Sequence, residues 1–375
     1  MKILFAGDFS VQDRAIKLFD DRSKAIHAFN GVEEVCIQHD LSIVNFESPV
    51  TNCKTGILKD GPCIRNPKSS IEILQKIGFG LFTLANNHLK DYGEQGVIDT
   101  FNALKEQQMA FVGAGRNIDE ARCPFIFECN EEKIAIINVC ENESSIATNF
   151  QAGACPISEI NLYYDITALR SKVDYIAVII HGGREHFRFP TPRMKKLYHY
   201  IIDLGADFIA NHHQHCYSGF EKYHGKYIFY GLGNFYFDNP KKRNNEWNKG
   251  LLISVNFDKK ISFEIIPYTQ CDDKPEIQLE PYDAVAHELE KINEIIVDDA
   301  KLTQAYKNMV MKEHVLSPMQ PYTLHYVRAL YHRGILPDLI SKKKKVAILN
   351  SIRCETHREL LITYLETLLS EKLLP

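Results

Sequence analysis

The sequence predicts an α/β fold, in which short strands alternate with helices over about the first 225 residues. Two observations predict it: apolar runs of β type recur along the chain, and amphipathic stretches lie between them. Most of the apolar runs are nearly continuous, as in strands that are buried on both faces. We therefore expect sheets enclosed by helices.

The predicted elements follow one another in a regular order. Six strands are expected first, at Lys2–Asp8, Leu41–Glu47, Phe79–His88, Lys133–Cys140, Asp174–Gly183 and Ala206–His215. The stretches SIEILQKIG, GVIDTFNALKEQQM and MKKLYHYIIDLG between them have helical apolar spacing, and the first and third end on a glycine suited to a helix C-terminus. More alternating strands are expected within residues 226–270.

After about Pro281 the pattern becomes helical. Helices are expected over Tyr282–Ile296, Asp298–Lys312, Pro321–Arg333 and His357–Leu373. We place one boundary near residue 280, between a main domain (1–280) and a helical C-terminal extension (281–375). A charged cluster in this extension fits a surface ion pair, the alternative being a lid or a partner-binding surface; it comprises Arg353, Glu355, His357 and Arg358.

The composition restricts the classes of function. The formal net charge is -4 with both signs interspersed, so no large basic field is present to attract nucleic acid or anionic membrane. The N-terminal apolar run is too short for a signal peptide, and no window approaches the roughly 18 apolar residues of a membrane span. The ten scattered cysteines, without a CxxC pair, favour free thiols. We expect a cytoplasmic protein without stable membrane insertion.

Residues able to bind metal stand at the ends of most predicted strands. They are Asp8, Glu47, Asn87 with His88, His181, and His213 with His215. Each alone is weak evidence, because such residues also form turns and caps. Ligands in open α/β sheets bind beyond the carboxyl ends of strands, so residues distant in sequence are expected to converge there.

The chemistry of this set indicates the metal. Carboxylates, imidazoles and an amide oxygen, without cysteine, suit Mn, Fe or Zn rather than Ca. All of these residues except His88 make up a set of six ligands, which is too many for one open catalytic ion. Two divalent ions sharing a bridging carboxylate fit better, and a pair about 3.5–4 Å apart is the usual arrangement for hydrolysing phosphate esters. A hydroxide bridging the ions would be the natural nucleophile.

Seven motifs carry a resemblance to a known family. They are GD (Gly7, Asp8), NFE (Asn45–Glu47), ANNHLKDYG (Ala85–Gly93), GAG (Gly113–Gly115), HGGRE (His181–Glu185), HHQH (His212–His215) and YGLGNF (Tyr230–Phe235). In order and spacing, from residue 1 to about 270, they resemble the capsule-synthesis CapA/PgsA (poly-γ-glutamate synthesis) family of the calcineurin-like metallophosphoesterase superfamily. The resemblance implies a four-layer αββα sandwich with a dinuclear metal centre at its edge.

The resemblance also implies roles for single residues. Asp8 and His215 would hold one ion, Asn87, His181 and His213 the other, and Glu47 would bridge them. His88 falls on the position of the superfamily's catalytic histidine, which protonates the leaving oxygen, and Asp91 could orient its ring. The chain departs from the superfamily at Ser10, where many phosphatases carry histidine, and it lacks the N-terminal membrane anchor of the best-known family members.

Basic side chains near these positions are candidates for substrate contact. Lys59, Arg65 and Arg184 could bind phosphate oxygens, and the alternative for each is a solvated loop. His212 alternates with His213 on a predicted strand and should therefore point to the opposite face, as a packed or supporting residue.

We therefore expect a metal-dependent phosphoesterase that acts on a phosphorylated carbohydrate or surface-polymer precursor in capsule or polysaccharide biosynthesis. The alternative is a non-hydrolytic, metal-binding component of a capsule or poly-γ-glutamate assembly machinery, with capsule-synthesis proteins as partners. An oriented proton donor at His88 favours the enzyme.

Overall fold

The computed structural model describes residues 1–59 and 61–312, together with residues 341, 344–345, 348–349, 352 and 365. The chain divides into two compact units, Met1–Met309 and Val310–Pro375. The helices predicted over 321–333 and 357–373, apart from Leu365, and the cluster of Arg353, Glu355, His357 and Arg358 lie outside the described residues.

Two sheets form the centre of the first unit. The eight-stranded sheet has the order β16 (Ile277–Leu279), β15 (Ser262–Gln270), β14 (Lys249–Asn256), β1 (Lys2–Ser10), β2 (Leu41–Phe46), β3 (Leu81–Thr83), β4 (Ala110–Val112), with β13 (Asn234–Phe237) also paired to β1. The six-stranded sheet has the order β11 (Phe220–Tyr223), β12 (Lys226–Phe229), β10 (Phe208–His212), β9 (Tyr175–His181), β7 (Glu132–Cys140), β6 (Phe125–Cys129). A short pair, β5 (Ala114–Gly115) and β8 (Gly153–Ala154), is separate.

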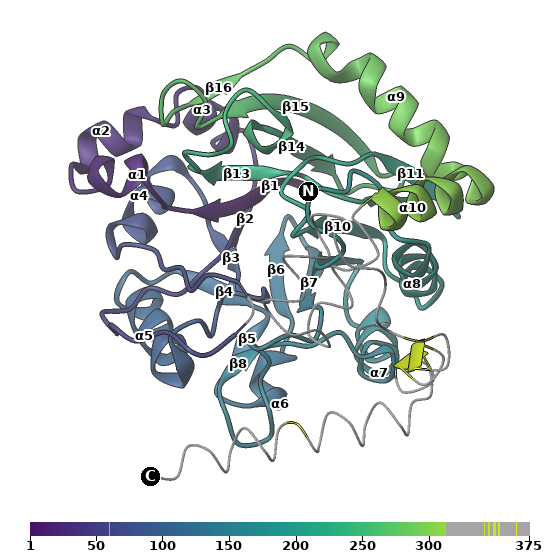
Figure 1. Ribbon diagram of the computed structural model, residues 1–375, viewed down its shortest axis with the longest axis horizontal. Coiled ribbons are helices and arrows are strands. Elements are labelled where there is room, and N and C mark those ends of the chain that lie inside the picture. Colours follow the sequence, from purple (N-terminus) through teal and green to yellow (C-terminus); the bar gives the residue numbers. More distant parts are fainter. Residues whose placement is uncertain are drawn as a thin grey trace. The chain divides into compact units, whose positions relative to one another are not determined.

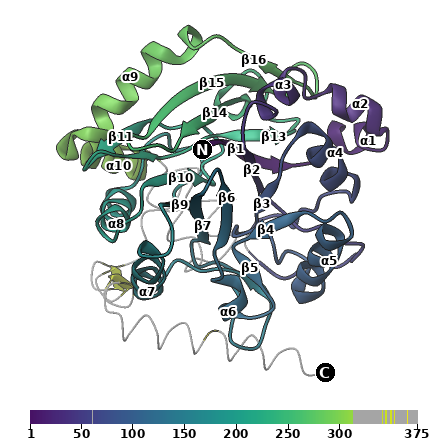
Figure 2. The ribbon, with the colours of Figure 1, turned by 180° about the vertical axis from the view of Figure 1, so that it is seen from behind.

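The two sheets pack face to face between layers of helices. Their inner faces meet through aromatic pairs such as Phe5 with Phe208, whose ring centroids lie 4.7 Å apart, and Phe229 with Phe263, at 5.1 Å. Figures 1 and 2 show α4 (Ser69–Ile77) and α5 (Gly93–Glu106) outside the first sheet, and α7 (Glu159–Arg170) and α8 (Pro192–Asp203) outside the second. This arrangement confirms the predicted α/β fold with four layers.

Shorter helices complete the first unit. They are α1 (Arg14–Leu18), α2 (Arg22–His27), α3 (Val32–Cys36), α6 (Ile118–Ala121) and the 3₁₀ turn η1 (Glu246–Asn248). Two longer helices follow the sheets, α9 (Asp283–Val297) and α10 (Asp299–Lys312), as predicted. α9 and most of α10 belong to the first unit, so the predicted division near residue 280 lies inside it. An independent extension over residues 281–375 stays a prediction.

Glycine ends two helices where the sequence predicts it. Gly78 caps α4 with φ 110°, and Gly205 follows the last residues of α8 with φ 118°. These left-handed conformations carry little steric cost for glycine and stop the helix. The strand predicted over 79–88 is wrong at its end, because β3 stops at Thr83. The side chain of Asn86 donates to the carbonyl oxygens of Phe46 and Leu84, and these bonds hold a turn in place of a longer strand.

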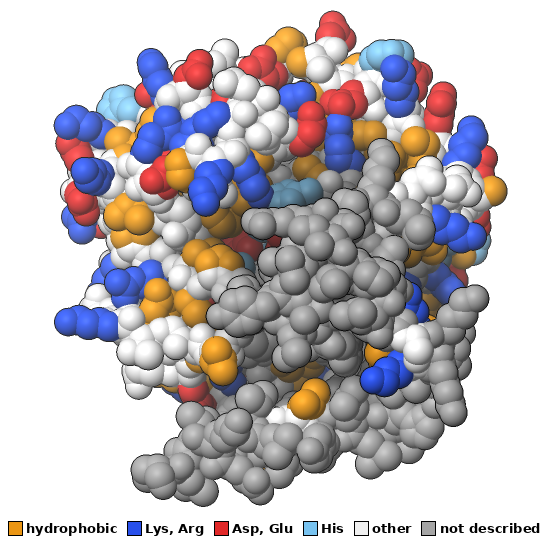
Figure 3. Space-filling model, viewed as in Figure 1, with side chains coloured by type: hydrophobic (Ala, Val, Ile, Leu, Met, Phe, Trp, Pro, Cys, Tyr) orange, Lys and Arg blue, Asp and Glu red, His pale blue; other side chains and the backbone are white. Residues whose placement is uncertain are grey.

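The surface and the cysteines agree with the composition. On the face shown in Figure 3, cationic and anionic side chains are interspersed over the described surface, without a field of one sign. Nine of the ten cysteines belong to the described residues, and these nine are free. Within the described ranges, no helix has the length and apolarity needed to cross a bilayer.

Candidate metal centre

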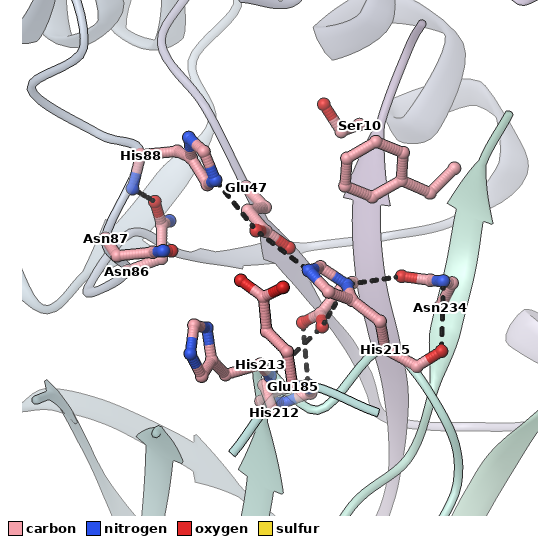
Figure 4. Close-up of polar contacts among 12 residues, drawn as sticks. Ser10, Glu47, Asn86, Asn87, His88, Glu185, His212, His213, His215 and Asn234 are labelled. Carbon is pink, nitrogen blue, oxygen red and sulfur yellow. Dashed lines mark hydrogen bonds and ion pairs between the residues drawn. The ribbon is translucent and has the colours of Figure 1, made fainter. Parts of the chain in front are cut away.

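The predicted ligands meet at one edge of the sandwich. Asp8 lies in β1, Glu47 follows β2, His181 ends β9, and His213 and His215 follow β10. β1 runs parallel to β2, and β9 parallel to β10, so each pair brings its carboxyl ends to the same edge. In Figure 4, His88 and His215 point toward Glu47. The structure therefore brings the predicted metal ligands together.

A close backbone approach fixes Asp8. Its amide donates to the carbonyl oxygen of Gly233 at 3.1 Å, and Asp8 is the register partner of Asn234 in β13. A Cβ added to Gly7 would lie only 2.0 Å from that same carbonyl oxygen, and Gly233 has φ +77°. Glycine is therefore needed at position 7 of the GD motif, because any side chain would prevent this close approach of the two strands.

The His181 Nε2 atom lies at the distances from two further donor atoms that are expected of ligands to one ion. The His181 Nε2 atom is 3.0 Å from Asn87 Oδ1 and 3.1 Å from His213 Nδ1. Neighbouring ligands about 2.1 Å from an ion are separated by roughly 3.0–3.4 Å. On its other side, His181 Nδ1 lies 3.1 Å from the Asn45 amide nitrogen, which fixes the ring.

Asp8 and His215 are held by separate contacts. Asp8 Oδ1 accepts from Asn45 Nδ2 at 2.6 Å, and Oδ2 accepts from the backbone amide of His213 at 3.1 Å. The Nδ1 atom of His215 lies 2.8 Å from Asn234 Oδ1, and its Nε2 atom faces Glu47 Oε1 at 3.9 Å. An imidazole bonded at Nδ1 in this way keeps Nε2 free for a metal ion.

Glu47 is the residue that most clearly needs a cation. Its side chain is 0% exposed, and within the described part of the chain neither carboxylate oxygen has a hydrogen-bond partner. The nearest imidazole nitrogens, His88 Nε2 and His215 Nε2, are 3.8 and 3.9 Å from Oε1, too far for a hydrogen bond. A buried, unpaired carboxylate is costly, and a metal ion would compensate it. Asp8, Glu47 and His181 each place one ligand atom within 4.8 Å of the others, so the residues fit a metal.

The local electrostatics prepare the donors for metal binding. Burial opposes ionisation of Asp8, but the adjacent imidazoles of His212, His181 and His215 outweigh it and lower the pKa of Asp8. Burial lowers the pKa of His181 well below its usual range, with a further contribution from His213. Burial also lowers the pKa of His213 and of His215. The site thus presents a carboxylate and neutral imidazoles, the forms that bind metal.

The raised pKa of Glu47 should make the unfolding free energy of the metal-free protein depend on pH. Burial, followed by the charges of Asp8, Glu185 and Asp91, raises its pKa well above the usual value of 4.5. A carboxyl group with a raised pKa stabilises the fold below its unfolded pKa and loses this contribution as the pH rises. Glu47→Gln removes the group, so the unfolding free energy of the variant should rise relative to wild type from pH 4.5 toward neutrality. Urea unfolding in chelator across this range measures the difference, and a constant difference would contradict it.

His88 and Asp91 form a pair beside the metal ligands. The His88 Nδ1 atom lies 2.7 Å from Asp91 Oδ2, and Asp91 is fully buried. The backbone amide of His88 donates to Asn86 Oδ1 at 3.1 Å. The ring therefore turns its Nε2 atom toward Glu47, as Figure 4 shows.

The three candidates for substrate contact lie in different surroundings. The side chain of Lys59 is 4% exposed and lies beside His88, where its ammonium donates to Asp91 Oδ1 at 2.6 Å and to the Asn87 carbonyl oxygen at 3.3 Å. Its ammonium therefore faces Asp91, and contact of Lys59 with a substrate phosphate stays a prediction. Arg65 donates to the Cys53 carbonyl oxygen and lies 5.3 Å over the ring of Tyr92, lining a cavity of about 650 Å³. Arg184 is exposed in the loop after β9.

Several supporting residues escape the sequence reasoning. Asn45 and Asn234 orient ligands, and the carboxylate of Glu185 is directed into the same cluster in Figure 4. All three lie within the family-like motifs NFE, HGGRE and YGLGNF, and this position could have identified them as residues of the site. Strand alternation predicts that His212 points away from His213, but β10 ends at His212 and His213 has φ 89°, so the alternation stops there. The Nδ1 atom of His212 lies 3.3 Å from Asp8 Oδ1.

Known proteins share these features of the sequence. Residues 2–239 match the family described as Bacterial capsule synthesis protein PGA_cap. The PGA biosynthesis protein CapA of Bacillus subtilis (strain 168) is 30% identical over 269 residues, 70% of either chain. The capsule biosynthesis protein CapA of Bacillus anthracis is 30% identical over 247 residues, 64% of this chain and 60% of its own. A crystal structure of a novel phosphatase from Mycoplasma pneumoniae is 20% identical, with 73% of this chain and 95% of that chain covered and a TM-score of 0.47.

Proposed function

Because the chain belongs to the bacterial capsule synthesis PGA_cap family, we propose that it is a dinuclear metal-dependent phosphoesterase of capsule biosynthesis. Its substrate would be a phosphorylated carbohydrate or surface-polymer precursor. We also propose a cytoplasmic location, on the basis of the free thiols. Because one fold can host many functions, the residues of the site carry this proposal.

One observation carries the proposal: a buried, unpaired carboxylate and an oriented imidazole face each other. Glu47 has no hydrogen-bond partner for either oxygen among the described residues, and His88 Nε2 points at it from 3.8 Å. A structural metal site needs ligands, whereas it has no use for a histidine held by a carboxylate on its far side. The His88–Asp91 pair therefore favours catalysis over metal storage.

The residues divide into binding and proton-transfer roles. Asp8 and His215 would hold one ion, Asn87, His181 and His213 the other, and Glu47 would bridge. Two divalent ions in such a site supply a reactive water at neutral pH and stabilise charge on the phosphoryl group.

The proton transfer falls to His88. Its Nδ1 atom is bonded to Asp91 Oδ2, so the proton available to a leaving oxygen is on Nε2. The carboxylate of Asp91 would stabilise the protonated ring, and Lys59 would keep Asp91 in place. Arg184, in the loop next to Glu185, and Arg65 would contact the substrate phosphate.

The purified protein is expected to hold close to two transition-metal ions after reconstitution. The reason is the number of converging ligands, which exceeds what one open ion uses. Elemental analysis after removal of loosely bound metal measures the content for Mn, Fe and Zn. No bound transition metal, or only Ca, would contradict the proposal; one ion would indicate that the half with Ser10 in place of histidine binds weakly.

A hydrolysis screen tests the activity itself. The metal-loaded protein is assayed against phosphomonoesters, phosphodiesters and glycan phosphates. Turnover that is lost on chelation and restored by metal supports the phosphoesterase. The relatives are named as biosynthesis proteins, which favours a second function, a non-hydrolytic metal-binding component of a capsule assembly machinery. Full metal content without hydrolysis of any ester would support that function.

A further inference from the structure

Arg188 contacts three other segments of the chain, at Tyr217–Ser218, Glu246 and Glu288. It lies in the loop that follows His181, and its side chain is only 17% exposed. Its Nε atom donates to the Tyr217 carbonyl oxygen at 3.3 Å, and its guanidinium lies 4.3 Å over the Tyr217 ring. Its own carbonyl oxygen accepts from Ser218 Oγ at 2.7 Å. The loop after β9 is therefore bound to the loop after β10, where His213 and His215 lie.

The charge of Arg188 is balanced by acids from elsewhere in the chain. Its Nη1 atom lies 3.1 Å from Glu246 Oε2 and is also ion-paired with Glu288 Oε1. The second oxygen of Glu288 accepts from the hydroxyl of Tyr217. Burial opposes ionisation of Glu288, but the bonds from Arg188 and Tyr217 lower its pKa to about 2. Glu288 is thus a carboxylate that holds both Arg188 and Tyr217.

Glu288 belongs to α9, beyond the family-matched residues 2–239. Figure 1 shows α9 reaching the end of the sheet at β11, and a second contact fixes it there. The Asn293 Oδ1 atom of α9 accepts from the backbone amide of Phe220, the first residue of β11, at 2.8 Å. α9 is therefore attached directly after the His213–Ser218 loop.

Glu246 connects the same network to the single tryptophan of the chain. Trp247 follows Glu246, is 5% exposed, and packs against His215 with ring centroids 4.6 Å apart. Its indole nitrogen donates to the Phe237 carbonyl oxygen at 2.8 Å. A displacement of Arg188 would therefore affect the position of His215 in two ways, through Tyr217 in the same loop and through Trp247, which packs on its ring.

From these contacts we infer that α9 is a positioning element of the metal centre, in which Glu288 holds Arg188 and Tyr217 and thereby fixes His215 and Trp247. Glu288 and Arg188 are positioning residues, because they act through His215 and do not touch the reacting groups. The metal-affinity part of this inference rests on the proposed function; the part that concerns Trp247 does not. Residues 283–297 are thus part of the working site.

Fluorescence of the metal-free protein tests the inference without any assumption about activity. Glu288→Gln keeps the shape of the side chain but removes its charge, and Glu290→Gln makes the same change at an exposed position of α9. We expect acrylamide quenching of Trp247 to rise about twofold or more in Glu288→Gln, because a loosened loop opens locally more often. Glu290→Gln should match wild type.

Metal titration provides the second readout. Loss of a supporting contact behind a metal ligand typically costs about 10–100-fold in affinity, which is the loss expected for Glu288→Gln. Tyr217→Phe, which removes only the hydroxyl, should change both readouts in the same direction by a smaller amount.

Two outcomes would overturn the inference. Quenching and metal affinity equal to those of Glu290→Gln, whether or not the melting temperature falls, would reduce Glu288 to a stabilising residue. A Tyr217→Phe variant with both readouts unchanged, should Glu288→Gln fail to fold, would do the same. Wild-type protein that binds no metal would contradict the proposed function, and the quenching result would still decide the role of α9.

Discussion

Replacing His88 with asparagine is expected to lower turnover of alkyl phosphate esters by about 10²–10⁴-fold, the usual contribution of a positioned general acid. An alkoxide is a poor leaving group at neutral pH, so its oxygen must be protonated as the bond breaks. Because His88 is bonded to Asp91 and not to a predicted ligand side chain, metal content and thermal stability should stay near those of wild type. Steady-state kinetics with an alkyl ester, together with elemental analysis, measure both.

An aryl ester such as p-nitrophenyl phosphate provides the internal control. Its leaving group needs little protonation, so His88→Asn should affect its hydrolysis much less. His199→Asn is a matched protein control, because His199 also pairs with a carboxylate, Glu221, at 2.7 Å. It should leave both substrates unaffected. An equal loss on the alkyl and aryl esters would remove the general-acid role of His88.

Replacing Glu47 with glutamine is expected to weaken metal binding by about 100-fold or more, since changes behind a ligand alone cost 10–100-fold. Glu47 is the carboxylate proposed to touch both ions, and glutamine keeps its size while removing the charge. Loss of one bridging group should therefore reduce the occupancy of both ions together. Calorimetric titration of the metal-free variant measures the affinity and the number of sites.

Two further variants control for burial and for location. Glu221→Gln changes a carboxylate whose side chain is 8% exposed and which bonds His199 and Tyr230 outside the cluster. His186→Gln changes a half-exposed side chain at the rim, next to Glu185. Both should bind metal nearly as wild type does. Affinities for Glu47→Gln equal to those of either control would show that the bridging role is misassigned.

The strands and the convergence of the site follow from local patterns. Apolar runs such as Asp174–Gly183 need burial on both faces, and parallel pairing then places their terminal polar residues at one edge. For this reason Asp8, Glu47, His181 and His213 could be grouped from the sequence, and the structure brings them together.

Other details depend on contacts that a linear pattern does not contain. The strand predicted to reach His88 stops at Thr83, because the amide of Asn86 pairs with carbonyl oxygens from β2 and from its own turn. The direction of Lys59 is set by Asp91, which lies 32 residues further along the chain. The role of Glu288 depends on a contact with Arg188, 100 residues away. Such long-range polar pairs leave no periodic signal in the sequence.

The contact between Gly7 and Gly233 sets a distance within the candidate metal centre. Asp8 and Asn234 are register partners across β1 and β13, and the side chain of Asn234 contacts His215. The two residues proposed to hold one ion, Asp8 and His215, are therefore positioned by two strands in direct backbone contact. The backbone contact between β1 and β13 thus sets the distance between the Asp8 carboxylate and the His215 imidazole. A methyl group at position 7 would clash with the Gly233 carbonyl oxygen and push the two strands apart, which would lengthen this distance without altering any ligand. Metal binding at the proposed site would then be disturbed through a residue that is not one of the proposed ligands.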